Sequence, residues 1–195
     1  MNERLRKQIE FIIEIDKIKH IIRQTGLFDG SRRENDAEHA WHLAVMAMVL
    51  HEHANEEVDV PRVIKMVLIH DLVEIDAGDV PVYETKKRTE NEKNERDAAR
   101  RIFGLLPRDQ AEELIDLWEE FEAKKTPEAR FAAALDRMEP VMQNFMTQGQ
   151  VWKKFGVDAE TVTSVNRHIR NGSDELWNYV EKIISDSVEM GFLKE

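Results

Sequence analysis

A long apolar run over residues 63–76 contains the adjacent pair His70–Asp71 and, one helical turn later, Glu74. Its length and composition predict a helix that is buried on most sides. A neutral histidine needs one hydrogen bond in such a place, whereas bare carboxylates are costly to bury without a positive partner. Any fold of this chain must therefore supply that partner, and a bound metal ion is the natural one.

His39 and Asp136 lie on separate predicted helices, in Asn-Asp-Ala-Glu-His and Ala-Leu-Asp-Arg. A bundle that packs these helices against the pair would close a site of two imidazoles and two carboxylates. Since the chain has no cysteine, imidazole and carboxylate must hold any metal, and this mixture suits manganese, cobalt, nickel, iron or zinc more than calcium. Glu74 projects to the same side of its helix as the pair and is the candidate proton-transfer group.

Each of these residues taken alone has a simpler interpretation. A lone histidine on an apolar face is more often structural than functional, and a His-Asp dipeptide by itself means little. His42, three residues after His39, fits a second ligand or an ordinary core residue. The combination over three predicted helices is what favours a metal-dependent hydrolase.

Helical periodicity and capping signals extend over most of the chain. No alternating strand pattern, fixed repeat or linker is evident, so the sequence predicts an all-α, single-domain helical bundle. We expect residues 1–195 to form this domain, with a metal-site core at about 15–140 and C-terminal helices at 150–195 packing on it. The expected helices cover 3–24, 36–50, 61–76, 84–103, the segments after Pro107 and Thr126, 158–170 and 174–190.

The helix expected at residues 36–50 is apolar on both sides. Trp41, Val45 and Met48 form one stripe, and Leu43 and Met46 belong to another. A helix that is apolar nearly all round is expected at the centre of a bundle.

Charge and hydropathy exclude several classes of partner. The 195 residues include 28 Lys plus Arg against 39 Asp plus Glu, a formal net charge of −11, which opposes binding of nucleic acid. No segment approaches the roughly 20 apolar residues that span a bilayer. We therefore expect a cytoplasmic protein with a small-molecule substrate and no membrane partner.

Several motifs in this chain resemble one known family, the HD-domain metal-dependent phosphohydrolases, and within it the small branch that includes bacterial 5′-deoxynucleotidases. The similarity extends over about residues 15–140. The motifs are Glu38-His39, His70-Asp71-Leu72-Val73-Glu74, Gly78-Asp79-Val80-Pro81 and Asp136.

The resemblance implies a helical bundle, often a homodimer, that hydrolyses the phosphate monoester of a (deoxy)nucleoside 5′-monophosphate. It implies one divalent metal ion (manganese, cobalt, nickel, iron, zinc or magnesium) held by the positions matching His39, His70, Asp71 and Asp136. By the same resemblance Glu74 and Asp79 line the nucleotide pocket, and Arg23, near the end of the first helix, meets the phosphate.

Two sequence details refine this interpretation. No histidine lies between Asp71 and Asp136, whereas relatives with two metals have further histidines there, so a single metal is favoured. The deoxynucleotidases have a tryptophan after the phosphate-binding arginine that helps to exclude a ribose 2′-hydroxyl, but Gln24 follows Arg23 here. Alternatives are an HD hydrolase of another phosphorylated small molecule or nucleotide, a non-catalytic metal-containing nucleotide-binding regulator, and a purely structural scaffold.

Overall fold

The computed structural model describes residues 2–195, apart from the side chains of Thr85 and Arg88. It confirms the all-α prediction, because helices account for most of the chain. The α-helices are α1 (Glu3–Ile15), α2 (Asp36–Leu50), α3 (Val60–Ile69), α4 (Glu74–Ala77), α5 (Thr85–Phe103), α6 (Arg108–Ala123), α7 (Pro127–Met146), α8 (Gln150–Phe155), α9 (Ala159–Asn166) and α10 (Asp174–Glu189). Short 3₁₀ helices are η1 (Asp16–His20), η2 (His51–His53), η3 (His70–Val73) and η4 (Arg167–Asn171).

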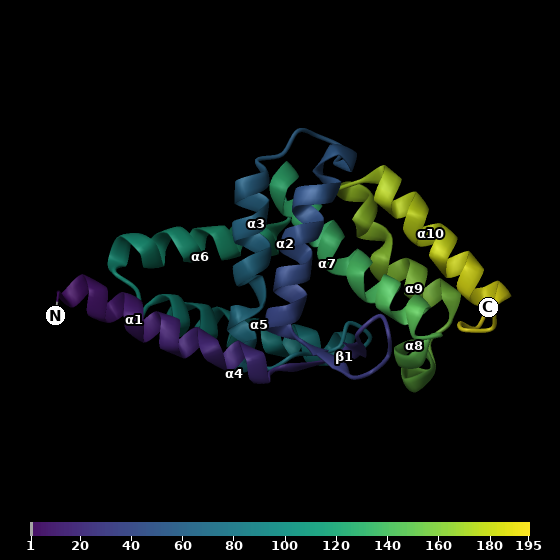
Figure 1. Cartoon of the computed structure of the whole chain (residues 1–195), viewed down its shortest axis with the longest axis horizontal. Helices are drawn as coiled ribbons and strands as arrows, with labels where there is room; N and C mark the ends of the chain where they lie inside the picture. Colours follow the sequence, from purple (N-terminus) through teal and green to yellow (C-terminus); the bar gives the residue numbers. More distant parts are fainter. Residues whose placement is uncertain (1) are drawn as a thin grey trace.

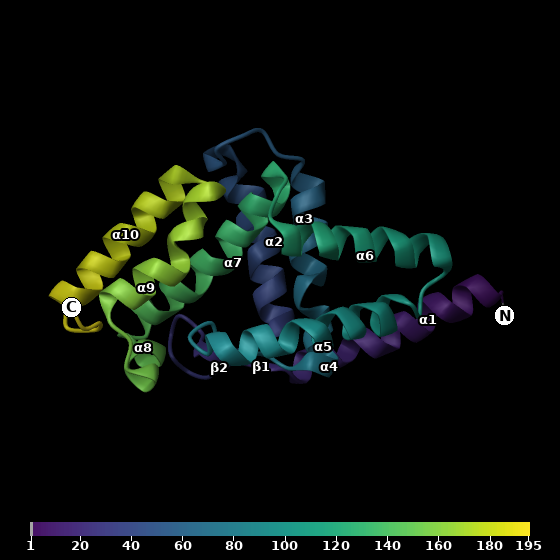
Figure 2. The ribbon, with the colours of Figure 1, turned by 180° about the vertical axis from the view of Figure 1, so that it is seen from behind.

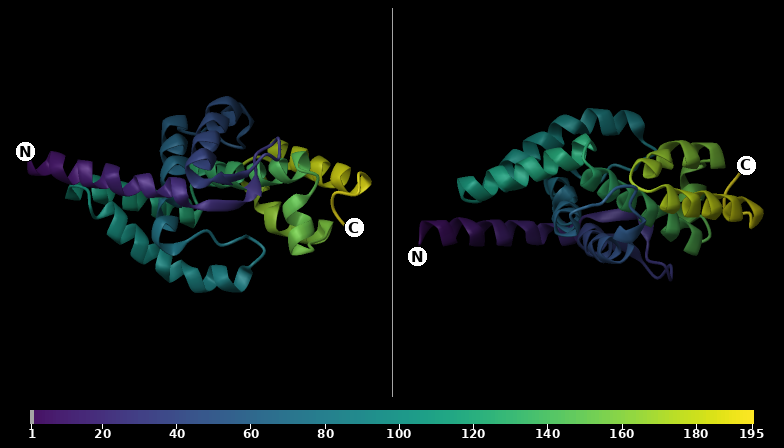
Figure 3. Two further views of the ribbon diagram at one scale, coloured as in Figure 1. Left: turned by 60° about the horizontal axis from the view of Figure 1, so that its bottom comes forward. Right: turned by 90° about the horizontal axis from the view of Figure 1, so that it is seen from above.

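Helices α2 and α3 lie side by side across the middle of the molecule and pack on α7 (Figure 1). Seen from behind, α6 lies towards the N-terminal end, α5 runs along the lower edge from the middle towards that end, and α8, α9 and α10 lie towards the C-terminal end (Figure 2). Helix α1 projects along the long axis, so the termini lie at opposite ends of the molecule (Figure 3). The functional residues on α2 and α7 thus belong to the middle of the fold.

Two apolar cores flank this middle region. The larger one joins α2, α3 and α7 to the C-terminal helices, with Phe131 and Trp152 among its fully buried side chains. The smaller one joins α1, η3, α5 and α6 around Ile102 and Phe103. Helix α6 contributes to both, with Phe121 in the first and Trp118 in the second.

Capping residues define several helix starts as the sequence predicts. Asn35 and Glu38 form a reciprocal capping box at α2, Thr126 caps α7 ahead of Pro127, and Ser173 caps α10. Each of these side chains accepts a hydrogen bond from a backbone N–H that has no partner within its helix. The structure therefore confirms these three predicted helix starts.

The predicted helix at residues 3–24 is wrong in its second half. Helix α1 ends at Ile15, and residues Ile22–Gly26 form strand β1, antiparallel to β2 (Arg33–Asn35). Extended backbone suits the adjacent β-branched residues Ile21 and Ile22. Strands of five and three residues are too short to show an alternating pattern, so the sequence did not reveal them. Arg23 consequently lies on a strand and not on a helix.

Two other helix predictions need correction, and one helix was missed. The segment 61–76 divides into α3, η3 and α4, so that the pair His70–Asp71 lies in a tighter 3₁₀ turn. The segment 158–170 divides into α9 and η4, and the six-residue helix α8 was not predicted. Short elements and changes of helical pitch leave little periodicity to detect.

One of the two stripes of α2 is exposed, contrary to the prediction of a helix buried on both sides. Leu43 is fully buried, but Trp41 is 65%, Val45 39% and Met48 59% exposed. Periodicity identifies apolar faces, but it does not tell whether the same chain covers them.

Candidate metal centre

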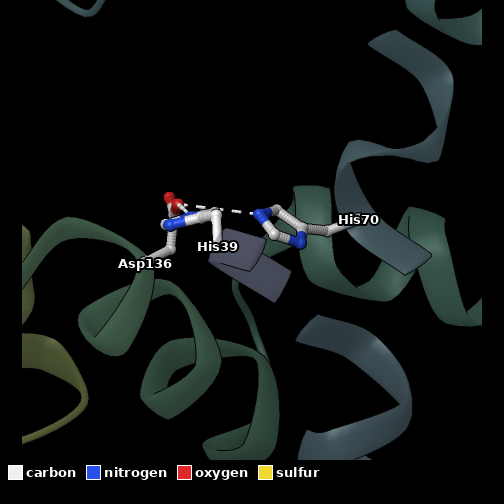
Figure 4. Close-up of side chains that lie close together, drawn as sticks. All are labelled: His39, His70 and Asp136. Atoms are coloured by element: carbon white, nitrogen blue, oxygen red, sulfur yellow. Dashed lines mark hydrogen bonds and ion pairs between the residues drawn. The ribbon is translucent and has the colours of Figure 1, made fainter. Parts of the chain in front are cut away.

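His39, His70 and Asp136 converge from α2, η3 and α7, and their donor atoms lie within 4.8 Å of one another (Figure 4). The Oδ1 atom of Asp136 lies 3.1 Å from Nε2 of His39 and 3.6 Å from Nε2 of His70. Ligand atoms that share one ion at about 2.1 Å lie about 3.0–3.4 Å apart in octahedral or tetrahedral sites. The separation between Asp136 and His39 fits this range, and with the other two separations below 4.8 Å the three side chains are close enough to hold one divalent ion after small side-chain shifts.

The buried ring nitrogen of His70 supports the same conclusion. Its Nδ1 atom lies 3.0 Å from the carbonyl oxygen of Val67 and donates its proton there in the neutral tautomer. Its Nε2 atom is buried between Oδ1 of Asp71 at 3.1 Å and Oδ1 of Asp136 at 3.6 Å, and forms no well-aligned hydrogen bond among the described residues. A buried imidazole nitrogen that faces two carboxylates is the arrangement that a metal completes.

His39 is held by a carboxylate that sequence reasoning missed. Its Nδ1 atom lies 3.2 Å from Oε2 of Glu139, which is fully buried on α7. Gln143 donates to Glu139 at 2.5 Å, and Nδ1 of His42 lies 3.3 Å from it. A carboxylate behind a ligating histidine fixes the ring orientation and makes the imidazole a better ligand. The available signal was the position of Glu139, three residues after Asp136 on an otherwise apolar helix face.

Asp71 joins the metal group to Arg23. Its Oδ1 atom lies 3.1 Å from Nε2 of His70, and its Oδ2 atom accepts a hydrogen bond of 2.8 Å from Nη1 of Arg23. Asp71 therefore stands beside the three converging side chains with one oxygen towards them, and its role as a fourth ligand stays a prediction. A second group of possible ligand atoms in the described residues consists of Glu34, His39 and Glu139. His42 belongs to neither group and contacts Glu139 instead.

The pKa shifts of the clustered side chains indicate that this site favours positive charge. Burial acts to lower the pKa of His70, but Asp71 and Asp136 raise it to about 9. For His39, burial and the charge of Arg23 act to lower the pKa, yet the carboxylates around the ring, led by that of Asp136, raise it well above its usual range. The pKa of Asp136 is held well below its usual range, against its burial, by those two histidines. A divalent ion would replace the protons that these imidazoles otherwise hold.

Arg23, Glu74 and Asp79 line the same cavity as His70 and Asp136. Burial, followed by the charges of Asp71 and Asp36, raises the pKa of Glu74 well above its usual range. Burial likewise raises the pKa of Asp79. The raised pKa of Glu74 favours its protonated form, which suits proton transfer.

The cavity has about 1150 Å³ of empty space, counting its open mouth. Its walls also include the aromatic side chains of Tyr83, Trp152 and Phe121, and the Phe121 ring lies 4.8 Å from that of His70, centre to centre. Gln24 also lines it and accepts a hydrogen bond of 2.5 Å from Nζ of Lys154 on α8. Arg137, which sequence reasoning did not single out, lines it beside Asp136. Polar groups at one end and aromatic groups elsewhere are typical of a small-molecule site.

No helix within residues 2–195 combines the length and the apolar character that crossing a bilayer requires.

Comparison with known proteins gives consistent results. Residues 15–177 match the model of an HD domain family. A human protein named 5′-deoxynucleotidase HDDC2 is 30% identical over 139 residues, which is 71% of this chain and 67% of the human one. A fission yeast (Schizosaccharomyces pombe) protein named 5′-deoxynucleotidase hdd1 is 28% identical over 142 residues, 70% of each chain. The chain thus spans about two thirds of the length of these relatives.

Solved structures agree on the fold. A predicted metal-dependent phosphohydrolase from Magnetospirillum magnetotacticum is 49% identical and superposes with a TM-score of 0.92, over 98% of this chain and 99% of the other. The PH0347 protein of Pyrococcus horikoshii, 21% identical with a TM-score of 0.65 over 90% of this chain and 99% of its own, shares the fold. The resemblance inferred from the motifs around His39, His70 and Asp136 is confirmed. This chain belongs to the HD domain family.

Proposed function

We propose that this protein is a metal-dependent phosphohydrolase that removes the phosphate group of a nucleoside 5′-monophosphate. The observation that carries the proposal is the convergence of His39, His70 and Asp136 at the wall of a cavity that Arg23 and Glu74 also line. The curated relatives named 5′-deoxynucleotidases support the same substrate class.

His39, His70, Asp71 and Asp136 would hold one divalent ion, whose identity among manganese, cobalt, nickel, iron, zinc and magnesium the donor set leaves open. Such an ion supplies Lewis acidity towards water and towards the phosphoryl group. The protein contributes a rigid frame, because Glu139 and the carbonyl of Val67 orient the two imidazoles.

The remaining polar groups divide the work at the phosphate ester. Arg23 would bind the phosphate oxygens by charge-assisted hydrogen bonds. Glu74 would move a proton, to or from the attacking water or the leaving oxygen, since its burial favours the protonated form. Asp79 would hold a sugar hydroxyl or assist the leaving oxygen. The aromatic side chains around the cavity offer surfaces for a nucleobase.

The sugar is left open in this proposal. Gln24 lines the cavity directly after Arg23, where the deoxynucleotidases that the motifs resemble have a tryptophan. An amide is smaller than an indole and can donate and accept hydrogen bonds. We therefore do not restrict the substrate to deoxyribonucleotides.

A phosphate-release assay tests the proposal. The metal-loaded protein is incubated with ribo- and deoxyribonucleoside 5′-monophosphates of each base, beside its Asp71→Ala and His70→Ala variants. Release by the wild type that both variants lose supports the proposal. Failure of the fully metal-loaded wild type to release phosphate from every nucleotide refutes it.

We further propose one HD-type domain and a homodimer. Helix α7 packs on α2 and α3 and also on α10, which favours one domain over separate core and C-terminal units. An exposed apolar stripe on α2 supports the dimer, because stripes of this kind are usually covered by an interface. It consists of Trp41, Val45, Met48 and Val49. A cytoplasmic location stays a prediction.

A further inference from the structure

Asp36 begins α2, yet it does not behave as a residue at a helix N-terminus usually does. The preceding Asn35 already caps the helix together with Glu38, so Asp36 is not needed as a cap. An acidic residue in a first turn usually faces water and interacts favourably with the helix dipole. Asp36 is instead 0% exposed. A buried carboxylate at this position requires another explanation.

Its Oδ1 atom accepts a hydrogen bond of 3.1 Å from Nη1 of Arg23. The same Nη1 atom donates to Oδ2 of Asp71 at 2.8 Å. Oε2 of Glu34 lies 3.9 Å from the Nε atom of Arg23. Strand β1 thus delivers a guanidinium group into a ring of three carboxylates.

The contacts of Arg23 are unevenly distributed over its guanidinium group. Nη1 forms both hydrogen bonds, whereas Nε is buried without a hydrogen bond and Nη2 forms none in the described part of the chain. About 13% of the side-chain surface remains accessible, and the residue lines the cavity. One end of the guanidinium is therefore anchored, and donors remain for a ligand.

Asp71 alone would be a weak anchor. Its other oxygen lies beside His70, and Asp71 is itself a proposed metal ligand, so a bound ion would draw on its charge. Asp36 belongs to neither group of ligating atoms among the described residues. It is also costly, because its Oδ2 atom is buried without a donor partner. A buried carboxylate that is not the helix cap and is paired with a residue of the cavity wall points to a role in the site.

We propose that Asp36 is a positioning residue for the phosphate-binding step: together with Asp71 it fixes the Nη1 end of Arg23, which leaves the Nη2 end to the phosphate of the substrate. The inference deepens the proposed function and depends on its assignment of Arg23 to the phosphate. Asp36 acts on the phosphate through Arg23, and its carboxyl group also interacts with that of Glu74.

The test measures binding of inorganic phosphate to the manganese-loaded protein by calorimetry, so it does not depend on turnover. Asp36→Ala should weaken phosphate binding about tenfold or more, as expected when a charge-assisted hydrogen bond is lost. Asp36→Asn, which keeps an acceptor oxygen, should lose less. Asp174→Ala is the matched control, because Asp174 opens α10 as an exposed first-turn acid. It should bind phosphate as the wild type does.

A double-mutant comparison separates positioning from general destabilisation. Once Arg23→Ala has been introduced, adding Asp36→Ala should change phosphate affinity less than twofold, because no guanidinium remains to be positioned. Manganese affinity should stay within twofold of the wild type in every Asp36 variant. If Asp36→Ala does not fold, the same comparison is made with Asp36→Asn.

Three results would overturn the inference. The wild type does not bind phosphate, the Asp36→Ala variant binds phosphate within twofold of the wild type, or Asp36→Ala lowers phosphate affinity equally in the wild type and in the Arg23→Ala variant. The proposed function alone is refuted if the variants bind inorganic phosphate as expected but the wild type hydrolyses no nucleotide. Nucleotide hydrolysis with phosphate binding indifferent to Asp36 would refute this inference alone.

Discussion

Replacing Glu139 by glutamine should weaken metal binding without touching a ligand. Glu139 is fully buried. Its carboxylate lies next to Nδ1 of His39, accepts a hydrogen bond from Gln143 and contacts His42. Although burial acts to raise the pKa of Glu139, His39 and His42 lower it to about 2. The side chain is therefore ionised at neutral pH, and glutamine of nearly equal volume removes only its charge and one acceptor oxygen.

The size of the effect follows from the position of this carboxylate. Loss of an outer partner of a ligating histidine typically costs 10- to 100-fold in metal affinity, which is about 1.4–2.7 kcal/mol. We expect the upper half of this range, because an amide NH₂ directed at the Nδ1–H group of His39 would repel it. Manganese affinity is measured by competition with a chelator of known strength.

Glu120→Gln provides the control. Glu120 is a largely buried carboxylate on α6 that binds Arg62 and Thr126, away from the metal group. The Glu120→Gln substitution should lower thermal stability and leave manganese affinity unchanged. Manganese affinity of a folded Glu139→Gln protein within twofold of the wild type would refute the assigned role of Glu139.

Three further perturbations address different parts of the molecule. Glu74→Gln should keep metal affinity and lose at least about 100-fold in kcat, since general acid–base catalysis typically contributes that much; a variant with full turnover would contradict the role given to Glu74. Burial, aided by the charges of Arg137 and Lys124, lowers the pKa of His168 to about 4. The pKa of His168 is lower in the folded than in the unfolded protein. Its contribution to the free energy of unfolding is therefore intact above about pH 6.5 and is lost as the pH falls towards 4. After allowance for its partial exposure this is about 1–2 kcal/mol. Denaturation of His168→Gln by urea between pH 4 and 7 should show a flatter profile than the wild type, and identical profiles would exclude the effect. Trp41→Glu should convert the proposed homodimer to a folded monomer in sedimentation experiments, because it places a charge in the exposed stripe of α2; a dimer that survives it must use another surface.

Much of the candidate site could be predicted because its residues carry local signals. His70, Asp71 and Glu74 stand out as ionisable groups in an apolar run, and burial of charge is costly wherever the chain folds. His39 and Asp136 were identified by the same reasoning on two other segments, and the structure brings both to His70. Whether Asp71 binds the metal and Arg23 the phosphate stays a prediction.

Residues that act through a partner distant in sequence escaped prediction. Asp36 is at a helix start and resembles an ordinary first-turn acid, and Glu139 is one of three acidic residues on α7. Their importance comes from Arg23, 13 residues away from Asp36, and from His39, 100 residues away from Glu139. No periodicity within one helix reports such a pairing.

The amino-acid sequence by itself determined the helical class, most helix starts and the candidate residues His39, His70 and Asp136 that the structure brings together. Helix caps, prolines and the spacing of apolar residues act over a few positions, and their energies depend little on the rest of the fold. Only the tertiary structure decided that Arg23 lies on a strand, that one stripe of α2 stays exposed, and that Glu139 and Asp36 stand behind His39 and Arg23. These features depend on which distant surfaces meet, because burial and charge pairing are properties of the packed molecule rather than of any one segment.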